Sequence, residues 1–344
     1  MANKDYGFFS RLLHKITLGK RIVTETSFDI EKSLFINSNF QHINLNHVYI
    51  SGLARAGTTF LMNQLYKSGD FISLTYRDMP FVLAPNFWRL ISSFSKKQNE
   101  MKERAHRDGV LVSSESPEAL EEVFWSTFCR NQYIKDDFLI PMHADKETIE
   151  NYQAYVSLIL RGHEHRRYIS KNNNNILRFG SICQAFPKAT LLIPFRNPIQ
   201  QAFSLMKQHK NFLKKHAEDP FAKQYMTWLV HHEFGSDHRP FFSEKSTIEY
   251  NTDEINYWLQ LWLNTYSFIV NEIPPQGVLI CYEKLCNNAD DIWEKLVDRL
   301  SVSDSIIPVE TWEKDFYKIS PEKLSTTLHR KADDLYNKMI DNSL

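Results

Sequence analysis

The residues with the clearest capacity for chemistry lie in one short loop near the start of the chain. Residues 52–59 have the sequence GLARAGTT and lie between a predicted strand and a predicted helix. The backbone N–H groups of such a loop, at the positive end of a helix, bind anions. Arg55 adds a guanidinium that can pair with two oxygens at once, and Thr58 and Thr59 add hydroxyl donors. The loop is therefore a candidate phosphate site.

This loop departs at one position from the phosphate loop of nucleoside triphosphatases. The glycine spacing fits G-x-x-x-x-G-K-[ST], but Thr58 occupies the position of the lysine. In those enzymes the lysine reaches the β- and γ-phosphates, and a Ser or Thr helps to hold magnesium. Here the cation is Arg55, which precedes the second glycine. Taken alone, the loop could also be an ordinary connection between a strand and a helix.

A second cationic position follows the apolar run TLLIPF at residues 190–195. Arg196 comes directly after this predicted strand, and Ser204 lies eight positions later, about two helical turns on. Ligands of open parallel sheets bind beyond the carboxyl ends of the strands, so Arg196 is expected at the same edge as the first loop. Two anion sites without a carboxylate for magnesium predict a ligand with two separated phosphate-like groups. For Arg196 alone, a surface ion pair is the alternative.

The elements that must position these residues alternate along the chain. We expect strands at residues 47–51, 71–74, 190–195 and 278–282, and helices at 58–67, 146–163, 198–206, 253–271 and 290–300. Another helix is expected to start at Ser116-Pro117, because Ser is a good N-cap and Pro suits the first helical position. The alternation predicts an α/β fold with a parallel sheet flanked by helices, similar to that of P-loop NTPases. A largely helical insertion at about residues 80–185 is expected to cover the cleft.

Composition excludes several classes of protein. The chain has 344 residues, 42% of them hydrophobic, and its 41 basic residues balance its 41 acidic ones. A dedicated nucleic-acid binder would carry a basic excess, and a disordered chain would have fewer apolar residues. The four cysteines form no C-x-x-C pair and the histidine clusters match no known ligand spacing, so no metal site is expected. Neither a signal peptide nor a membrane span is expected. The protein is therefore expected to be cytoplasmic.

Three regions are expected along the chain: an N-terminal arm (1–44), the α/β domain (45–302) and a C-terminal helical extension (303–344). In the arm, Phe8, Leu12 and Ile16 share one face of a predicted helix, with basic residues on the other. This face could pack on the body of the protein or on a partner subunit. It could also make peripheral contact with a membrane surface.

Taken together, the motifs resemble those of the sulfotransferases that use 3′-phosphoadenosine 5′-phosphosulfate (PAPS). In that family the first loop is similar to R-S-G-T-T and holds the 5′-phosphosulfate. Its counterpart here consists of Arg55, Ala56, Gly57, Thr58 and Thr59. An arginine in this loop is closer to the tyrosyl-protein and bacterial branches than to the cytosolic steroid and phenol enzymes, which carry a lysine.

Further matches follow in the same order along the chain. Arg196 and Ser204 resemble the Arg and Ser that hold the 3′-phosphate, within a segment similar to F-P-x-A-x-h-h-x-x-x-R-D-P in which Asn197 replaces the Asp. Lys171-Asn172-Asn173 resembles a lysine-containing turn, and residues 282–285 resemble a Y-E-x-L strand end. The matches cover about residues 47–286, but neither the N-terminal arm nor residues 303–344.

The resemblance implies transfer of a sulfuryl group from PAPS to a hydroxyl or amine, with 3′-phosphoadenosine 5′-phosphate as product. Arg55 would stabilise the oxygen that leaves. The acceptor would be a small molecule, a carbohydrate or a lipid-linked glycan. Aromatic residues would suit a sugar and would equally suit a core; they are Phe81, Phe87, Trp88 and Trp125.

The sequence does not decide which residue is the general base. Asp78 lies near the position of the base in the tyrosyl-protein branch, and His106 titrates near neutral pH. Glu115 and Glu118 are further candidates, although acids near a helix start commonly serve the helix dipole. Two other functions compete with sulfuryl transfer: a P-loop small-molecule kinase or NTPase, and a catalytically silent nucleotide-binding protein.

Overall fold

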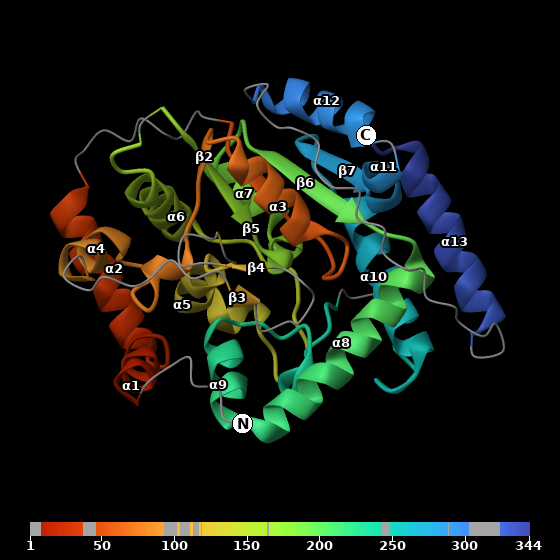
Figure 1. Cartoon of the computed structure of the whole chain (residues 1–344), viewed down its shortest axis with the longest axis horizontal. Coiled ribbons are helices and arrows are strands. Elements are labelled where there is room, and N and C mark those ends of the chain that lie inside the picture. The colour runs from red at the N-terminus through yellow and green to blue at the C-terminus, as the bar shows by residue number, and fades with distance from the viewer. Residues whose placement is uncertain are drawn as a thin grey trace.

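A five-stranded parallel sheet forms the centre of the molecule (Figure 1). The computed structural model describes residues 8–36, 46–92, 102–103, 111–112, 117, 119–163, 165–242, 248–287, 289–302 and 324–344. The strands of the sheet are β1 (Val48–Ile50), β2 (Phe71–Ile72), β5 (Arg167–Lys171), β6 (Thr190–Phe195) and β7 (Gly277–Cys281). Their order is β2-β5-β1-β6-β7, and all four neighbouring pairs are parallel. A separate antiparallel pair consists of β3 (Lys102–Glu103) and β4 (Leu111–Val112).

Helices cover both faces of this sheet. The α-helices of the first half are α1 (Phe8–Thr17), α2 (Arg21–Phe35), α3 (Thr58–Lys67), α4 (Pro85–Ser92), α5 (Glu122–Tyr133), α6 (Lys146–Ile159) and α7 (Phe179–Ala185). Those of the second half are α8 (Pro198–Glu218), α9 (Pro220–Trp228), α10 (Ile255–Glu272), α11 (Tyr282–Asn287), α12 (Ala289–Leu300) and α13 (Thr326–Asp341). Short 3₁₀ helices are η1 (Tyr76–Asp78), η2 (Asn173–Leu177) and η3 (Gly235–Asp237).

Successive side chains of each strand point to opposite faces of the sheet, and each face has its own apolar core. In β1, Val48 and Ile50 face the core shared with α3, α11 and α12, whereas Tyr49 faces the larger core on the opposite side of the sheet. In Figure 1 the N-terminal helices α1, α2 and α4 lie at one side of the molecule and α13 lies at the other. Both faces of the sheet are buried, as expected for parallel strands.

The fold class predicted from the sequence is confirmed. The strand at 190–195 and the helix at 58–67 have the expected bounds, and α8 continues to Glu218, well beyond the predicted residue 206. Within the predicted helical insertion, residues 167–171 instead form β5, a strand between β2 and β1. The short sequence RYISK has polar ends, and so it did not show the pattern of a buried strand.

The predicted helix start at Ser116-Pro117 is wrong. Pro117 forms an isolated antiparallel bridge with Thr75, and the helix begins at Glu122. Pro suits an extended segment as well as a first helical turn, so the local sequence did not decide between the two. Ser116 itself lies outside the described residues.

The N-terminal helices pack on the body of the protein. Phe28 of α2 is fully buried among aromatic rings of α5 and α6. Glu31 of α2 is also buried, and its carboxylate accepts hydrogen bonds from the backbone N–H groups of Asn86 and Phe87 at the start of α4. A carboxylate at a helix N-terminus is favourable because of the helix dipole. In the described part of the chain, every helix is too short or too polar to span a bilayer.

Candidate active site

The loop between β1 and α3 has a backbone conformation suited to surrounding an anion. Arg55 and Gly57 have φ angles of 70° and 88°, in the left-handed region that glycine adopts freely and other residues rarely adopt. A Cβ atom at Gly57 would lie 2.7 Å from a ring carbon of Tyr282. Glycine is therefore required at this position, and an arginine at positive φ is a strained conformation of the kind found at functional sites.

A buried glutamine fixes the loop in place. The amide nitrogen of Gln201 on α8 donates hydrogen bonds to the carbonyl oxygens of Leu53 and Ala54, at 3.1 and 2.9 Å. Its amide oxygen accepts from Nε1 of Trp262, at 2.9 Å, which also defines the orientation of the amide group. Gln201 was not recognised in the sequence. One signal was present: Gln201 and Ser204 are three residues apart and therefore share a face of the helix.

The structure brings together two of the predicted binding residues. Nε of Arg55 donates a hydrogen bond to Oγ of Ser204, at 3.2 Å. Ser204 is buried on α8, whereas Arg55 is partly exposed. Thr58 is buried at the start of α3 and Thr59 is half-buried beside it. The loop and α8 thus place a guanidinium and hydroxyl groups at the same edge of the sheet.

Arg196 lies at the carboxyl end of β6, as predicted, but it is buried instead of lying on the surface. It is 3% exposed, and its guanidinium carbon lies 5.1 Å from the centre of the Tyr282 ring, a cation–π contact. Its Nε atom lies 4.0 Å from Oε1 of Glu283 and has no hydrogen-bond partner among the described residues. A buried donor without a partner is costly, so this position favours an anionic ligand.

Glu283 connects the end of β6 to α13. Its Oε1 accepts a hydrogen bond from the backbone N–H of Asn197 at 2.9 Å, and its Oε2 accepts from the hydroxyl of Tyr336 at 3.0 Å. Burial and the neighbouring Glu283 raise the pKa of Tyr336, so this hydroxyl stays a donor. Asn197, which replaces the expected Asp, caps α8 by accepting from the N–H of Gln200. Tyr336 lies in a region for which no binding motif was recognised.

Comparison with known proteins decides the family. A model of the sulfotransferase family matches residues 47–239, which is more than half of the chain. The matched segment contains Arg55, Arg196 and Ser204. The chain belongs to the sulfotransferase family. The resemblance predicted from the motifs is confirmed, and the protein is a sulfotransferase.

Solved structures of three bacterial sulfotransferases are similar to this chain at low sequence identity. A sulfotransferase from Mycobacterium tuberculosis H37Rv is similar with a TM-score of 0.50 and 11% identity, over 85% of this chain and 77% of that chain. One from Alicyclobacillus acidocaldarius has a TM-score of 0.46 and 15% identity, over 87% and 97%. One from Mycobacterium avium has a TM-score of 0.49 and 10% identity, over 98% and 79%. No curated protein matches the sequence significantly.

One predicted base of the sulfotransferase lies in the described region. Asp78 is fully buried at the end of η1. One of its oxygens accepts hydrogen bonds from the N–H and hydroxyl of Thr75, and the other accepts from two nitrogens of Arg89, the shorter at 3.0 Å. Four donors therefore already surround this carboxylate, an arrangement typical of a residue that fixes a turn. The other candidates, His106, Glu115 and Glu118, lie outside the described residues.

The asparagine-rich turn after β5 forms a buried 3₁₀ helix, η2. Asn172 donates to Glu122 at 2.6 Å, and Asn175 donates to Glu121 at 3.0 Å. Arg178 pairs with both oxygens of Glu122, at 2.9 and 3.0 Å, and all these side chains are buried. The network holds the turn that follows Lys171.

Trp125, one of the four aromatic residues that could suit a sugar or a core, is fully buried beneath this network. Its Nε1 donates to Glu121, and its ring lies 5.0 Å from the Arg178 guanidinium. It therefore belongs to the core. Phe81 and Trp88 remain half-buried with ring centres 5.1 Å apart, and Phe87 is half-buried as well.

Proposed function

We propose that this sulfotransferase transfers a sulfuryl group from PAPS to a hydroxyl or amine acceptor and releases 3′-phosphoadenosine 5′-phosphate. The observation that carries the proposal is the hydrogen bond between Arg55 and Ser204. It joins the loop expected to bind the 5′-phosphosulfate to the helix expected to bind the 3′-phosphate. Two neighbouring cationic sites fit a ligand with two anionic groups.

The residues present fit such a ligand on two independent observations. Gly57, at a φ of 88°, lets the Tyr282 ring pack directly against the loop at the start of α3, which fixes the backbone conformation that directs the N–H groups of the loop. The buried Nε of Arg196 has no hydrogen-bond partner among the described residues, although a guanidinium offers five N–H donors. An anionic oxygen would satisfy this donor. We assign Arg55, Ala56, Gly57, Thr58 and Thr59 to the 5′ side, and Arg196 and Ser204 to the 3′ side.

The chain contributes charge and orientation to the reaction. The bound donor would supply an activated sulfuryl group. The N–H groups at the start of α3 and the guanidinium of Arg55 would neutralise the negative charge that develops on the departing oxygen. Such donors accelerate a reaction because they are already oriented before the charge develops. Asp78, His106 and Glu115 stay predictions for the base, with the Asp78 carboxylate better suited to fixing η1.

The proposed acceptor is a small molecule, a carbohydrate or a lipid-linked glycan, and the proposed location is cytoplasmic. We also propose that the N-terminal helices make peripheral contact with a membrane. Leu12 and Ile16 on α1 are each 43% exposed, and Ile22 on α2 is 72% exposed. The neighbouring Lys15 and Arg21 are exposed as well. Apolar side chains beside basic ones suit an anionic lipid surface.

Calorimetry with 3′-phosphoadenosine 5′-phosphate tests the cofactor directly. We expect micromolar binding to the wild type without metal. Arg196→Ala should weaken binding by about 10- to 100-fold, the equivalent of one charge-assisted hydrogen bond. Arg130→Ala is the matched control, because Arg130 is an exposed arginine on α5, and it should bind like the wild type. The melting temperature of each variant reports whether it is folded.

The competing functions predict different results in the same experiment. Tighter binding of ATP with magnesium than of 3′-phosphoadenosine 5′-phosphate (the bisphosphate) would support the kinase or NTPase interpretation. It would contradict the proposal. Bisphosphate binding without turnover on any acceptor would support a catalytically silent protein.

A further inference from the structure

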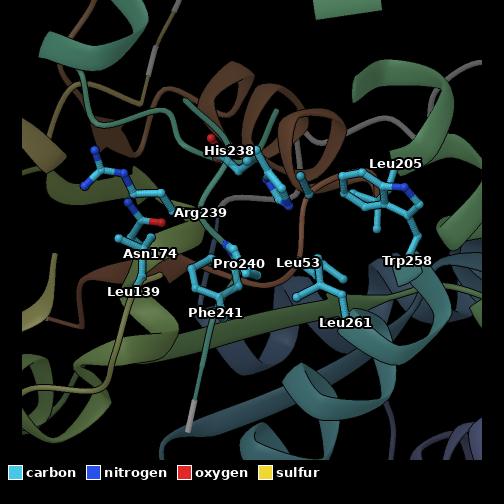
Figure 2. A pocket seen from close by; sticks show the side chains of 12 residues that line it. Leu53, Leu139, Asn174, Leu205, His238, Arg239, Pro240, Phe241, Trp258 and Leu261 are labelled. Atoms are coloured by element: carbon cyan, nitrogen blue, oxygen red, sulfur yellow. The ribbon is translucent and has the colours of Figure 1, made fainter. Parts of the chain in front are cut away.

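The pocket at the β1 end of the phosphate loop is too small for a second anionic group. This narrow pocket, large enough for about one water molecule, lies beside Leu53 and Ala54 (Figure 2). Apolar side chains form most of its lining, and Arg239, which also lines it, donates to Asp237 at 3.1 Å and to the carbonyl oxygen of Lys135 at 2.8 Å. The second phosphate-like group of the proposed ligand is therefore expected at the other end of the loop, near α3.

The ring of Tyr282 connects the α3 end of the loop with Arg196. A Cβ atom at Gly57 would lie 2.7 Å from this ring, so the ring and the loop backbone are in direct contact. The guanidinium carbon of Arg196 lies 5.1 Å from the centre of the same ring. Arg196 is only 3% exposed, and its Nε atom has no hydrogen-bond partner in the described part of the chain. This cation is therefore placed to receive the second anionic group.

Glu283 places a negative charge beside the same cation. Its Oε1 atom lies 4.0 Å from Nε of Arg196, about 1 Å more than the length of an N–H···O hydrogen bond. The two side chains are 19% and 4% exposed, so the attraction between them is only weakly screened. A small rotation of the carboxylate would close the distance and neutralise the arginine. A phosphate would then have to displace an anion that belongs to the protein.

Hydrogen bonds at both oxygens keep the Glu283 carboxylate in its present orientation. Oε1 accepts from the backbone N–H of Asn197 at 2.9 Å, and Oε2 accepts from the hydroxyl of Tyr336 at 3.0 Å. The thiol of Cys281 lies 3.5 Å from Oε2 and is a weaker donor. Asn197 and Cys281 lie at the carboxyl ends of β6 and β7, whereas Tyr336 belongs to α13. The Tyr336 hydroxyl is therefore the contact by which a helix distant in the sequence reaches the anion site.

The docking of α13 fixes the position of this hydroxyl. The Tyr336 ring lies 5.8 Å from the ring of Phe195, the last residue of β6, in an edge-to-face arrangement. At the end of α13, Nζ of Lys284 donates to the carbonyl oxygen of Ile340 and to the hydroxyl of Ser343, each at 3.0 Å. A cation at a helix C-terminus is favourable because of the helix dipole. The helix thus holds Tyr336 against the carboxyl end of β6.

We propose that Tyr336 is a positioning residue for the 3′-phosphate, because its hydroxyl holds the Glu283 carboxylate away from Arg196. This inference rests on the proposed function and deepens it. The arginine keeps an N–H group for the ligand only while the carboxylate is bound to other donors. Affinity for the 3′-phosphate is therefore set in part by α13, which lies outside residues 47–239, the segment that the family model matches.

Loss of the Tyr336 hydroxyl should act through charge instead of through packing. Without it, Oε2 of Glu283 loses its donor from α13, and the guanidinium of Arg196 can replace that donor. The ligand then competes with Glu283 for the same N–H group. An amide at position 283 carries no charge and would compete far less. The loss of affinity should therefore disappear when Glu283 is replaced by Gln.

Calorimetry of 3′-phosphoadenosine 5′-phosphate with the full chain tests this in the wild type, Tyr336→Phe, Glu283→Gln and the double variant. Tyr336→Phe keeps the ring beside Phe195, and we expect it to lower the affinity by about 10-fold, the equivalent of one hydrogen bond to a charged group. Glu283→Gln should bind at least as tightly as the wild type, because a negative charge beside the phosphate is removed. In the Glu283→Gln background, Tyr336→Phe should change the affinity by less than about 2-fold.

Asn337→Ala is the matched control, because Asn337 is the exposed neighbour of Tyr336 on α13, and it should bind like the wild type. The melting temperature of each variant reports whether it is folded. The same loss from Tyr336→Phe in both backgrounds would overturn the proposal, because it would show that α13 acts by packing. So would unchanged affinity of Tyr336→Phe, or a loss of about 10-fold or more in Glu283→Gln alone. Failure of the wild type to bind the bisphosphate would instead contradict the proposed function.

Discussion

Arg55 of the phosphate loop and Ser204 of α8 are joined by a hydrogen bond of 3.2 Å, although 149 positions separate them in the sequence. The bond uses Nε of the guanidinium. A guanidinium is a planar fork that can bind two oxygens of an anion at once. Ser204 thus orients the charge that the loop presents.

Removal of the Arg55 side chain should affect turnover more than binding. We expect Arg55→Gly to lower kcat by about 100- to 1,000-fold, as the loss of one transition-state donor does in other enzymes. Glycine is chosen because the φ angle of 70° would strain any other replacement. The measurement is sulfuryl transfer together with calorimetry of the bisphosphate. Equal losses in kcat and in affinity would contradict a specific role in the transition state.

Loss of the loop anchor should destabilise the protein and weaken binding. Gln201→Met keeps the approximate volume but leaves two backbone carbonyl oxygens and the indole N–H of Trp262 without their partner. We expect the free energy of unfolding to fall by about 1–3 kcal/mol, and bisphosphate affinity to fall as the loop loses its fixed conformation. Gln260→Met on α10 is the control, because the side chain of Gln260 donates to Asn264 at 3.0 Å and does not contact the loop. An unchanged melting temperature would contradict the anchoring role.

The buried pair of Glu122 and Arg178 should show strong coupling. Glu122→Gln removes the carboxylate that pairs directly with the buried Arg178, and we expect a loss of about 3–5 kcal/mol in the free energy of unfolding. The double variant Glu122→Leu, Arg178→Met removes both charges and should recover much of that loss. Urea denaturation of Glu122→Leu, of Arg178→Met and of the double variant measures the coupling. Additive losses would show that the pair does not act as a unit.

Two buried histidines should make the protein less stable in acid. Burial lowers the pKa of His209 and His238 from 6.5 to about 4. Between these values the unfolded chain binds more protons than the folded chain, so stability should fall as the pH decreases from 6.5 toward 4. We expect the melting temperature of His238→Asn to depend less on pH in this range. The half-exposed His329 on α13 provides the control variant, His329→Asn, which should keep the slope of the wild type.

Local sequence predicted the parts of the fold that depend on local patterns. The strand at 190–195 is a continuous apolar run, and the helix at 58–67 follows a glycine-containing turn, so both were assigned with the correct bounds. Arg55, Arg196 and Ser204 could be predicted to share one edge because parallel strands end at the same side of a sheet. β5 was missed because its polar ends, Arg167 and Lys171, hide a short buried centre, and its place between β2 and β1 is set by strands distant in the sequence.

The supporting residues of the site could not be predicted in the same way. Gln201, Glu283 and Tyr336 are ordinary polar residues in the sequence, and their roles arise from hydrogen bonds between distant segments. The burial of the asparagines could not be predicted either, because the carboxylates that pair with them lie about 50 positions earlier in the chain. Pairing of this kind becomes visible only when the segments are placed in space.

The contact between Glu283 and Tyr336 has a consequence for the newly synthesised chain. The phosphate loop emerges early during translation, but the carboxylate beside Arg196 obtains its second partner from α13. Until α13 has been synthesised and docked, Oε2 of Glu283 has the thiol of Cys281 as a neighbour, at 3.5 Å, but lacks its hydroxyl donor. The carboxylate beside Arg196 therefore reaches its final set of contacts only after α13 has docked, although the phosphate loop is synthesised well before α13.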